Sequence, residues 1–513
     1  MRLGIDFGTT HTVVAMGNRG NFPTVSFQDA DLDFHEFFPS VVAFEGGKVL
    51  YGFAAEQAAR RGAHRERSFK RWLGGINASP TQPMPGMEGL TLLDLVTGFL
   101  TALREALLKR STVSKLLSRG EPLQAAVAVP ANAHSAQRFI TLEAFRRAGF
   151  EVTVMMNEPS AAGIEFAHHH LSAITQKRDL VLVYDLGGGT FDVSLVMMEG
   201  GHHDILSSSG ISRLGGDDFD EILQEMALRE LAITRGNLST QSRARLLAHC
   251  CEVKEAIKPN TRRLFVDVGS CLDAGEIDQA KIGPAGVVTV AADEYEEACT
   301  RIVGRTLSEV DRVIAGREAE LAGVYVVGGA SSLPVVGRTL RQRFARRVHR
   351  SAQPSSSTAI GLAVAADPSS GVGVSERLNR CFGVFREADS GGNVSFDVIL
   401  DPALEVPTQF STRHTIQRRY QPAHNIGHFR FIECSSLTPD RIPSGDITHF
   451  AQVVFPFDPA LQQTGIDLRK ATITRMEVTD HWAEERYEID AAGIITLSMQ
   501  DLQTGYQQTH RFG

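Results

Sequence analysis

Residues 182–194 read LVYDLGGGTFDVS: an apolar run ends in an aspartate, three glycines follow, and a threonine and a second aspartate precede another apolar run. This order predicts two strands joined by a tight hairpin turn. Three adjacent glycines let the backbone bend sharply and leave bare N–H groups that attract phosphate. Because carboxylates repel phosphate, Asp185 and Asp192 make sense if a divalent cation and its waters lie between the two groups. The alternative is an ordinary glycine-rich hairpin with two solvated aspartates.

A second copy of this arrangement opens the chain. Residues 3–15 read LGIDFGTTHTVVA, again a strand, an aspartate, a glycine turn with hydroxyl residues, and a strand. Two such hairpins predict two similar lobes, each giving one phosphate-binding turn to a shared cleft. Neither hairpin matches the Walker pattern, and no G-x-G-x-x-G stands between a strand and a helix, so the phosphate-binding device is of another kind.

The composition is that of an ordinary globular chain. It has 513 residues, 42% of them hydrophobic and 22% charged, which leaves room for several domains. The net charge of −8 argues against a general nucleic-acid or anionic-membrane binder. In the arginine-rich stretch Arg338–Arg350, Leu340, Phe344 and Val348 recur every fourth residue, which predicts an amphipathic helix with the arginines on its wet face.

The sequence predicts a cytoplasmic protein without a membrane span. Met1 and Arg2 lead directly into the first strand, so no signal peptide is expected, and no apolar run approaches the ~20 residues of a membrane helix. The six cysteines form no C-x-x-C pair, which favours free thiols over disulfides or zinc. The run His168–His170 has no partners at ligand spacing, so a solvated loop is favoured over a metal site.

Strands and helices alternate through the first 370 residues, as in an α/β layer architecture. The pattern predicts helices over 92–108 and 134–148, and strands over 125–129 and 152–156. From Cys381 onward strand-like runs separated by turn residues predict a β-sandwich of about 130 residues. Its expected strands are Val394–Leu400, His428–Glu433, Ala451–Phe457, Thr472–Thr479, Arg486–Asp490 and Ile494–Met499.

Taken together, the motifs resemble one family, the seventy-kilodalton heat-shock chaperones of DnaK type, within the actin and sugar-kinase ATPase superfamily. Residues 5–10 resemble the family's first phosphate motif, residues 185–192 its second, and residues 327–334 (VGGASSLP) its adenosine motif. Four further matches narrow the superfamily to the family: Lys70-Arg71, Val129-Pro130-Ala131, Asn157-Glu158-Pro159 and residues 214–220 (LGGDDFD). The strand pair around residues 487–498 extends the resemblance, more weakly, into the sandwich.

The resemblance implies an α/β, two-lobed, actin-like ATPase domain followed by a smaller all-β sandwich domain. The expected boundaries are an ATPase domain over 1–370, a linker over 371–380 and a β-sandwich substrate-binding-like domain over 381–513. The family's linker is leucine-rich, whereas this stretch holds the single leucine Leu378, and no helical lid is expected before Gly513. Pro130 and Arg138 match the family's signalling proline and arginine, so some interdomain coupling is expected by another route.

The resemblance also assigns residues to a site for ATP or ADP with Mg²⁺, and it allows K⁺. Lys70 would neutralise charge on the γ-phosphate and position the attacking water, while Asp192 and Thr190 would complete the water and cation network. Asp6, Glu158 and Asp185 would hold the waters around Mg²⁺, with Glu158 and Asp185 also counted as catalytic. The expected nucleotide contacts are Asp6, Gly8, Thr9, Thr10, His11, Gly187, Gly188, Gly189, Gly215, Gly216, Lys254, Gly328, Gly329, Ala330 and Ser332.

The chain departs from the family at the adenosine site. In residues 251–258, the best match to the adenine-flanking helix, only Lys254 clearly agrees with the family pattern. Ala330 and Ser332 replace the family's usual serine and arginine. The departures predict weaker nucleotide affinity or a looser base preference.

Three functions remain in competition. The leading hypothesis is an ATP-hydrolysing chaperone-like protein whose β domain binds unfolded or apolar protein segments, with a co-chaperone and a nucleotide-exchange factor as further partners. The second is a nucleotide-gated adaptor that docks one dedicated protein, and the third is a small-molecule kinase. Phe396, Phe429 and Phe431 could line a peptide groove, but the inward face of a sandwich core is the favoured interpretation.

Overall fold

A computed structural model describes residues 2–512 except 76–77, 86, 88, 118–122, 171–172, 200–201, 212, 277–285, 373–375, 379, 389–391, 402–403, 408, 464–465 and 478–479. The chain divides into two compact units. The first unit comprises residues 1–161, 200–205 and 359–513, and the second comprises residues 162–199 and 206–358. The first unit therefore holds both the N-terminal lobe and the C-terminal β region.

The N-terminal lobe is built on a five-stranded sheet with the order β10-β9-β1-β2-β5. The first hairpin is confirmed, since β1 pairs antiparallel with β2, and β1 also pairs parallel with β9. The helix before β9 starts in a capping box, in which Thr91 and Asp94 satisfy each other's backbone N–H groups. The bounds are β1 (Arg2–Phe7), β2 (His11–Met16), β5 (Phe38–Pro39), α2 (Leu92–Lys109), β9 (Leu123–Val129), α3 (Ser135–Arg147) and β10 (Phe150–Asn157).

Smaller elements complete this lobe. A three-stranded sheet of order β7-β6-β8 and the strand pair β3–β4 lie between the first hairpin and α2 in sequence. The bounds are β3 (Phe27–Gln28), β4 (Phe34–His35), β6 (Val41–Glu45), β7 (Lys48–Tyr51), α1 (Phe53–Arg60), β8 (His64–Arg67), the 3₁₀ helix η1 (Phe69–Gly74) and α10 (Ser357–Ala366). Gly4 of β1 lies against α10 so closely that a Cβ would stand 2.2 Å from the carbonyl oxygen of Ala359.

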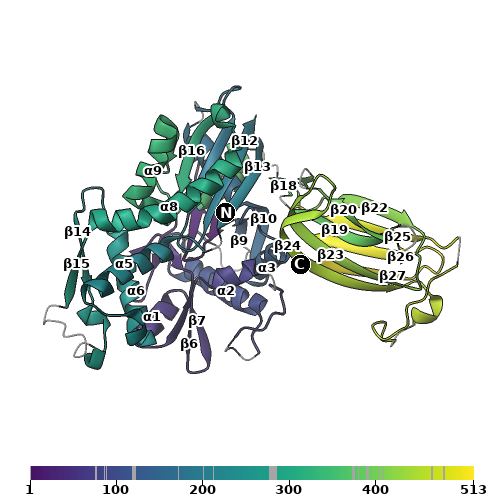
Figure 1. The fold of residues 1–513 in the computed structure, drawn as a ribbon, viewed down its shortest axis with the longest axis horizontal. Coiled ribbons are helices and arrows are strands. Elements are labelled where there is room, and N and C mark those ends of the chain that lie inside the picture. Colours follow the sequence, from purple (N-terminus) through teal and green to yellow (C-terminus); the bar gives the residue numbers. More distant parts are fainter. Residues whose placement is uncertain are drawn as a thin grey trace. The chain divides into compact units, whose positions relative to one another are not determined.

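The second unit contains the glycine hairpin predicted from residues 182–194. Its sheet has the order β13-β12-β11-β16-β17, with β11 and β12 antiparallel and β11 and β16 parallel. Figure 1 shows α8 and α9 beside these strands. The bounds are α4 (Glu158–His170), β11 (Leu180–Leu186), β12 (Phe191–Glu199), β13 (His202–Ile211), α5 (Gly216–Glu230), α6 (Thr240–Glu255), β14 (Arg263–Asp267), β15 (Val287–Ala291), α8 (Ala292–Ile314), β16 (Leu321–Val327), α9 (Pro334–Phe344) and β17 (Val348–Arg350).

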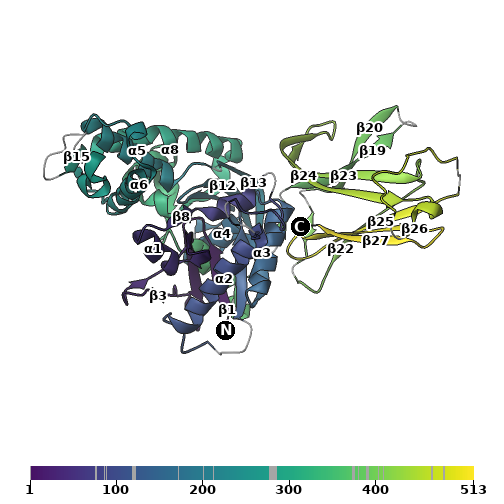
Figure 2. The same cartoon turned by 90° about the horizontal axis from the view of Figure 1, so that it is seen from below.

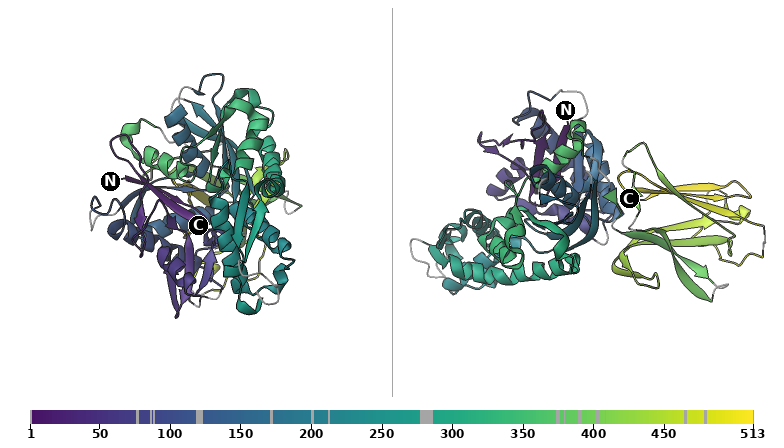
Figure 3. Two further views of the ribbon diagram at one scale, coloured as in Figure 1. Left: turned by 90° about the vertical axis from the view of Figure 1, so that its left-hand side faces the viewer. Right: turned by 90° about the horizontal axis from the view of Figure 1, so that it is seen from above.

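The C-terminal region is a sandwich of two four-stranded antiparallel sheets, with the orders β20-β19-β23-β24 and β22-β25-β26-β27. Figures 2 and 3 show the two sheets as separate layers. Alternate residues such as Phe382, Val384, Tyr487 and Leu497 fill the space between them. The bounds are β18 (Glu376–Arg377), β19 (Cys381–Ala388), β20 (Asn393–Leu400), β21 (Glu405–Val406), β22 (His414–Tyr420), β23 (Ile426–Leu437), β24 (Pro443–Pro456), β25 (Ala483–Ile489), β26 (Ile495–Asp501) and β27 (Gln507–Phe512).

Two expected elements are wrong. The helix predicted across the arginine-rich stretch ends at Phe344, because Ala345 has a φ of 53°, and Val348–Arg350 forms β17 against β16 instead. The strand predicted over Thr472–Thr479 does not form through Glu477, where the chain makes only an isolated bridge from Arg475 to His424, and its last two residues lie outside the described part.

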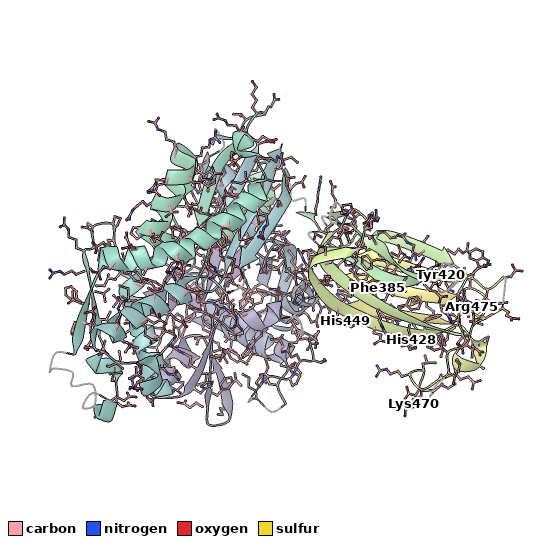
Figure 4. The ribbon with its side chains drawn as sticks, in the orientation of Figure 1. Phe385, Tyr420, His428, His449, Lys470 and Arg475 are labelled. Atoms are coloured by element: carbon pink, nitrogen blue, oxygen red, sulfur yellow. The ribbon has the colours of Figure 1, made fainter. Side chains whose placement is uncertain are left out.

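The three phenylalanines of the sandwich separate onto its two faces. Phe429 and Phe431 are buried in the core between the sheets, as the favoured interpretation expects. Phe396 instead pairs with Phe385 across β19 and β20, and Phe385, labelled in Figure 4, is 41% exposed. The sandwich core therefore uses two of the three candidates for a peptide groove.

The predicted linker is partly structured where it is described. Glu376–Arg377 forms the short strand β18 against β21, and Arg377 makes an ion pair of 3.2 Å with Asp204. The N–H of Leu378 donates to the carbonyl of Leu404. Residues 373–375 and 379 lie outside the described part, so the boundaries 370 and 381 stay a prediction.

Candidate functional site

The first phosphate turn connects β1 to β2. Asp6 stands near the end of β1, and the N–H of Gly8 donates to the carbonyl of Asp6 over 3.0 Å. A Cβ on Gly8 would lie 2.2 Å from the carbonyl oxygen of His11, so only glycine fits this turn. Thr9, Thr10 and His11 follow, half-buried, which leaves part of each side chain open to a ligand.

Lys70 and Glu158 form a close ion pair beside this turn. The Nζ of Lys70 lies 2.8 Å from Oε1 of Glu158, and the two side chains are only 9% and 15% exposed. Lys70 comes from η1 and also lies 5.4 Å from the ring centroid of Phe7, whereas Glu158 begins α4 directly after β10. Residues separated by 88 positions in the sequence thus lie in direct contact.

The electrostatics of this group fit a divalent cation. The pKa of Asp6 is raised to about 7, chiefly by burial and also by the nearby carboxylate of Glu158, while Lys70 opposes both effects. Two carboxylates thus share one ammonium, and a cation with its waters would supply the missing positive charge. Within the described residues no three His, Cys, Asp or Glu side chains gather closely enough to hold a metal ion themselves.

The second phosphate turn lies in the second unit, between β11 and β12. Asp185 and Asp192 stand opposite each other in the strand register, and the N–H of Gly187 donates to the carbonyl of Thr190 over 3.0 Å. The pair Gly215–Gly216 packs directly on this turn, because a Cβ on Gly215 would lie 2.6 Å from the nitrogen of Gly189. The three glycines are therefore held in place by a second glycine loop.

The adenosine motif starts where β16 ends, next to Asp185. Gly328 has a φ of 84°, and a Cβ there would lie 2.3 Å from Oδ1 of Asp185, so both the conformation and the space require glycine. Ala330 is buried in the core of the second unit, whereas Gly329 and Ser332 are exposed. The hydroxyl of Ser331 donates to the carbonyl of Gly328 over 2.6 Å and fixes the turn.

Lys254 is buried and engaged. Its Nζ lies 2.7 Å from Oδ1 of Asp220 and donates to the carbonyl of Gly216 over 3.0 Å. Sequence reasoning named Lys254 as a nucleotide contact and missed Asp220 as its partner. The signal was present, because Asp220 is the last residue of the LGGDDFD stretch, four positions after Gly216.

The structure gathers the predicted residues into two sets, one in each unit. Asp6, Gly8, Thr9, Thr10, His11, Lys70 and Glu158 belong to the first set. Thr190, Asp185, Asp192, Gly187, Gly188, Gly189, Gly215, Gly216, Lys254, Gly328, Gly329, Ala330 and Ser332 belong to the second. Their roles toward a nucleotide stay predictions.

A further site, which sequence reasoning missed, joins α3 to the β sandwich inside the first unit. The carboxylate of Glu433 on β23 accepts from the N–H of Ser135 over 3.1 Å and also from its hydroxyl, so it caps the N-terminus of α3. Glu433 is 4% exposed, and burial raises its pKa against the opposing effects of Ser135, Arg380 and Arg138. Arg511 of β27 stacks over Phe139 of α3.

Arg138 links this contact to the Lys70–Glu158 pair. One guanidinium nitrogen donates to the carbonyl of Ala492 in the sandwich over 3.4 Å, and another donates to Oδ1 of Asn157 over 2.6 Å. Asn157 directly precedes Glu158. Two hydrogen bonds of Arg138 therefore connect Ala492 of the sandwich with Asn157, the residue next to the predicted catalytic carboxylate of Glu158.

Comparisons with known proteins identify relatives of this chain. A family model described as "Hsp70 protein" matches residues 106–378. The chain is 32% identical over 382 residues to "Chaperone protein HscA" of Citrobacter koseri, an alignment that covers 71% of this chain and 57% of that protein. It is 31% identical to the HscA of Photorhabdus laumondii, with 72% and 58% covered, and 30% identical to the "Chaperone protein HscA homolog" of Burkholderia cenocepacia, also with 72% and 58% covered.

The chain belongs to the Hsp70 family. Members of this family are ATPases with an actin-like nucleotide-binding domain. Membership in the family implies a nucleotide-binding site, usually with Mg²⁺. The chain spans little more than half the length of the curated relatives that it matches. Within the described residues, no helix has both the length and the apolar character needed to cross a membrane.

Proposed function

We propose that this protein is an ATP-hydrolysing, chaperone-like member of the Hsp70 family whose nucleotide state is coupled to a β domain that binds protein segments. The observation that carries the proposal is the ion pair between Lys70 and Glu158, beside Asp6 and joined through Asn157 and Arg138 to the sandwich. It supplies both a place for phosphate chemistry and a physical route from that place to the β domain.

The residues of the site suit phosphoryl transfer, which needs positioning and charge neutralisation more than covalent help. Lys70 would neutralise charge on the terminal phosphate and orient the attacking water, because an ammonium is a compact point charge. The amide groups of the two glycine turns would bind phosphate oxygens. Mg²⁺, when bound, would neutralise phosphate charge, and Asp6, Glu158 and Asp185 would hold its waters, with Thr190 and Asp192 ordering the water nearby.

The proposal includes weaker recognition of the base. Lys254 is engaged by Asp220 and Gly216, and Ala330 is part of the hydrophobic core. Ser332, by contrast, has an exposed polar side chain. We expect nucleotide affinity to depend chiefly on the phosphates.

Coupling would run through α3. Its first turn is capped by Glu433, its Arg138 contacts Ala492, and its Phe139 supports Arg511. Loss of these contacts would release α3 from Glu433, Ala492 and Arg511 and would leave Arg138 holding Asn157 alone. The proposed partners are unfolded or apolar protein segments, a co-chaperone and a nucleotide-exchange factor, by analogy with chaperones of this family.

A nucleotide-gated adaptor for one dedicated protein is the second candidate. The burial of Phe429 and Phe431 in the sandwich core favours it, because these rings are then not free to line a groove for many different apolar peptides. ATP binding and interdomain coupling would be the same in both candidates, so only the range of bound partners separates them.

The experiment is peptide binding to the whole chain with ATP and separately with ADP, on a panel of unfolded and apolar peptides, together with ATP turnover of wild type and Lys70→Met. Turnover that depends on Lys70 and peptide affinity that differs between ATP and ADP support the chaperone. Turnover without binding of any peptide would reject it and leave the adaptor. Absence of both ATP binding and turnover would contradict both candidates.

A further inference from the structure

Lys254 occupies a place where a lysine is normally unfavourable. It belongs to the buried stripe of α6 that also contains Ser242, Leu246 and Cys250, at successive four-residue intervals. Its side chain is 8% exposed and that of its partner Asp220 is 2% exposed. A buried charge of this kind is costly unless it is paired, so the Lys254–Asp220 contact is the condition for Lys254 to lie there.

The same ammonium group reaches the glycine loop that packs on the second phosphate turn. Nζ of Lys254 donates to the carbonyl of Gly216, while the N–H of Gly216 donates to the carbonyl of Gly187 over 2.9 Å. The next amide, from Asp217, donates to the carbonyl of Gly188 over 2.7 Å. Peptide units 216 and 217 thus connect Lys254 on one side with the phosphate turn on the other.

We infer that Lys254 is a positioning residue for the nucleotide site. Its ion pair with Asp220 anchors the ammonium group, the ammonium group fixes the carbonyl of Gly216, and the amides of Gly216 and Asp217 then hold the turn Gly187–Gly189 in its phosphate-binding form. Lys254 acts through the glycine loop rather than by touching the base. The inference rests on the proposed function for the ligand, but its structural part concerns the protein without nucleotide.

A positioning role for Lys254 fits the pattern of departures from the family at this helix. In residues 251–258, the best match to the adenine-flanking helix, only Lys254 clearly agrees with the family pattern. A residue whose work is to hold the phosphate turn is needed even when contacts to the base are lost.

The test compares amide hydrogen exchange in the nucleotide-free whole chain for wild type, Lys254→Met and Lys177→Met. Loss of one hydrogen bond from a charged donor predicts about tenfold faster exchange at Gly216 and Asp217 in Lys254→Met, with a similar loss of affinity for ATP. Lys177 is exposed in the second unit and lies outside the candidate site, so Lys177→Met should leave both quantities unchanged. Exchange in the buried strand β16 reports on global stability and should stay constant.

Asp220→Asn tests whether Lys254 acts by positioning the glycine loop rather than by touching the base. In Asp220→Asn a positioning lysine loses its anchor, so exchange at Gly216 should increase and ATP binding should weaken. Lys254→Met combined with Asp220→Asn should reduce ATP affinity little more than either substitution alone. The double variant Lys254→Met/Asp220→Leu replaces the pair by apolar groups and keeps the test valid if a single variant fails to fold. Unchanged exchange in folded Lys254→Met, or undiminished ATP affinity in Asp220→Asn, would overturn the inference. Faster exchange in a chain that binds no ATP at all would instead reject the proposed function and leave the positioning contact intact.

Discussion

At the scale of single residues, local chemistry made the phosphate turns predictable. A strand followed by an aspartate and glycines favours a tight turn, and the structure confirms both hairpins. The partners of these residues were not predictable, because they come from distant positions. Lys70 meets Glu158 across 88 residues, and Ser135 meets Glu433 across 298.

Lys70→Met tests the proposed role of the ammonium group. We expect ATP turnover to fall by about a hundredfold or more, because a preorganised charge at the transferred phosphate contributes on that scale. Nucleotide binding should change much less. The matched control is Lys48→Met, at an exposed position of β7, which should keep full turnover. Steady-state phosphate release measures both variants, and normal turnover in Lys70→Met would remove Lys70 from the site.

Gly328→Ala tests the close approach of the adenosine motif to Asp185. The added methyl group would meet Oδ1 of Asp185 and would force a residue with a Cβ into a positive φ, so we expect a loss of about 1–3 kcal/mol in the free energy of unfolding. Gly304→Ala, inside α8 with no atom within 4 Å of the new methyl group, should instead stabilise the chain by up to about 1 kcal/mol. Thermal unfolding distinguishes the two, and equal stability of both variants would contradict the account.

At the scale of elements, the α/β alternation of the ATPase lobes was predicted well, since α2, α3, β9 and β10 lie within a few residues of their expected bounds. The sandwich was predicted less completely. Strands β19, β22 and β27 were not predicted, and β22 (HTIQRRY) shows why, because its alternation rests on Ile416 and Tyr420 among polar and charged residues. The false strand at Thr472–Thr479 has β-branched residues but lacks a partner strand over its described part, and strand formation depends on that pairing.

The cap that Glu433 places on α3 should depend on pH. The pKa of Glu433 is raised in the structure, so the state with the contact formed binds more protons than the state without it, between the ordinary pKa near 4.5 and the raised value. The contact is therefore strongest at low pH and weakens as pH rises through the raised pKa. The charged groups that act on Glu433 are Arg380 and Arg138, and both oppose the rise in its pKa; burial lowers the pKa of His134, the residue before Ser135.

Glu433→Gln and Glu433→Ala measure this contact. Glutamine still accepts from the N–H of Ser135 but does not titrate, so exchange at Ser135 should lose its pH dependence. Alanine removes the carboxylate that contacts Arg380 and the N-terminus of α3. This loss should lower the stability of the contact by about 2–4 kcal/mol. Amide exchange at Ser135 between pH 4.5 and 8 is the measurement. The same pH dependence in Glu433→Gln as in wild type would show that another group titrates.

At the scale of the whole molecule, membership of the Hsp70 family and the order of an ATPase region and a β region agree with the sequence analysis. The compact units follow a different division, because the β sandwich groups with the N-terminal lobe. Sequence could not reveal this grouping, since it depends on α3 offering Ser135, Arg138 and Phe139 to residues more than 290 positions away.

Arg138→Ala should uncouple the β domain from the nucleotide site. We expect ATP turnover to persist, while any change of turnover on adding a bound peptide or partner disappears, because the path from Ala492 to Asn157 is cut. Arg147→Ala is the matched control, because Arg147 lies in the last turn of α3 and pairs with Glu143 on the same helix, so this variant should retain coupling. Equal coupling in both variants would place the route elsewhere.

The measurement that tests the central claim most directly is amide hydrogen exchange of the first turn of α3 and of residues 490–493, in the wild-type chain with ATP, with ADP and without nucleotide. Coupling predicts that protection at Ser135 and at the turn around Ala492 differs between the ATP and ADP states, while the sandwich core around Tyr487 stays equally protected. Identical protection at Ser135 and residues 490–493 in both states, in a chain that demonstrably binds and hydrolyses ATP, would contradict it.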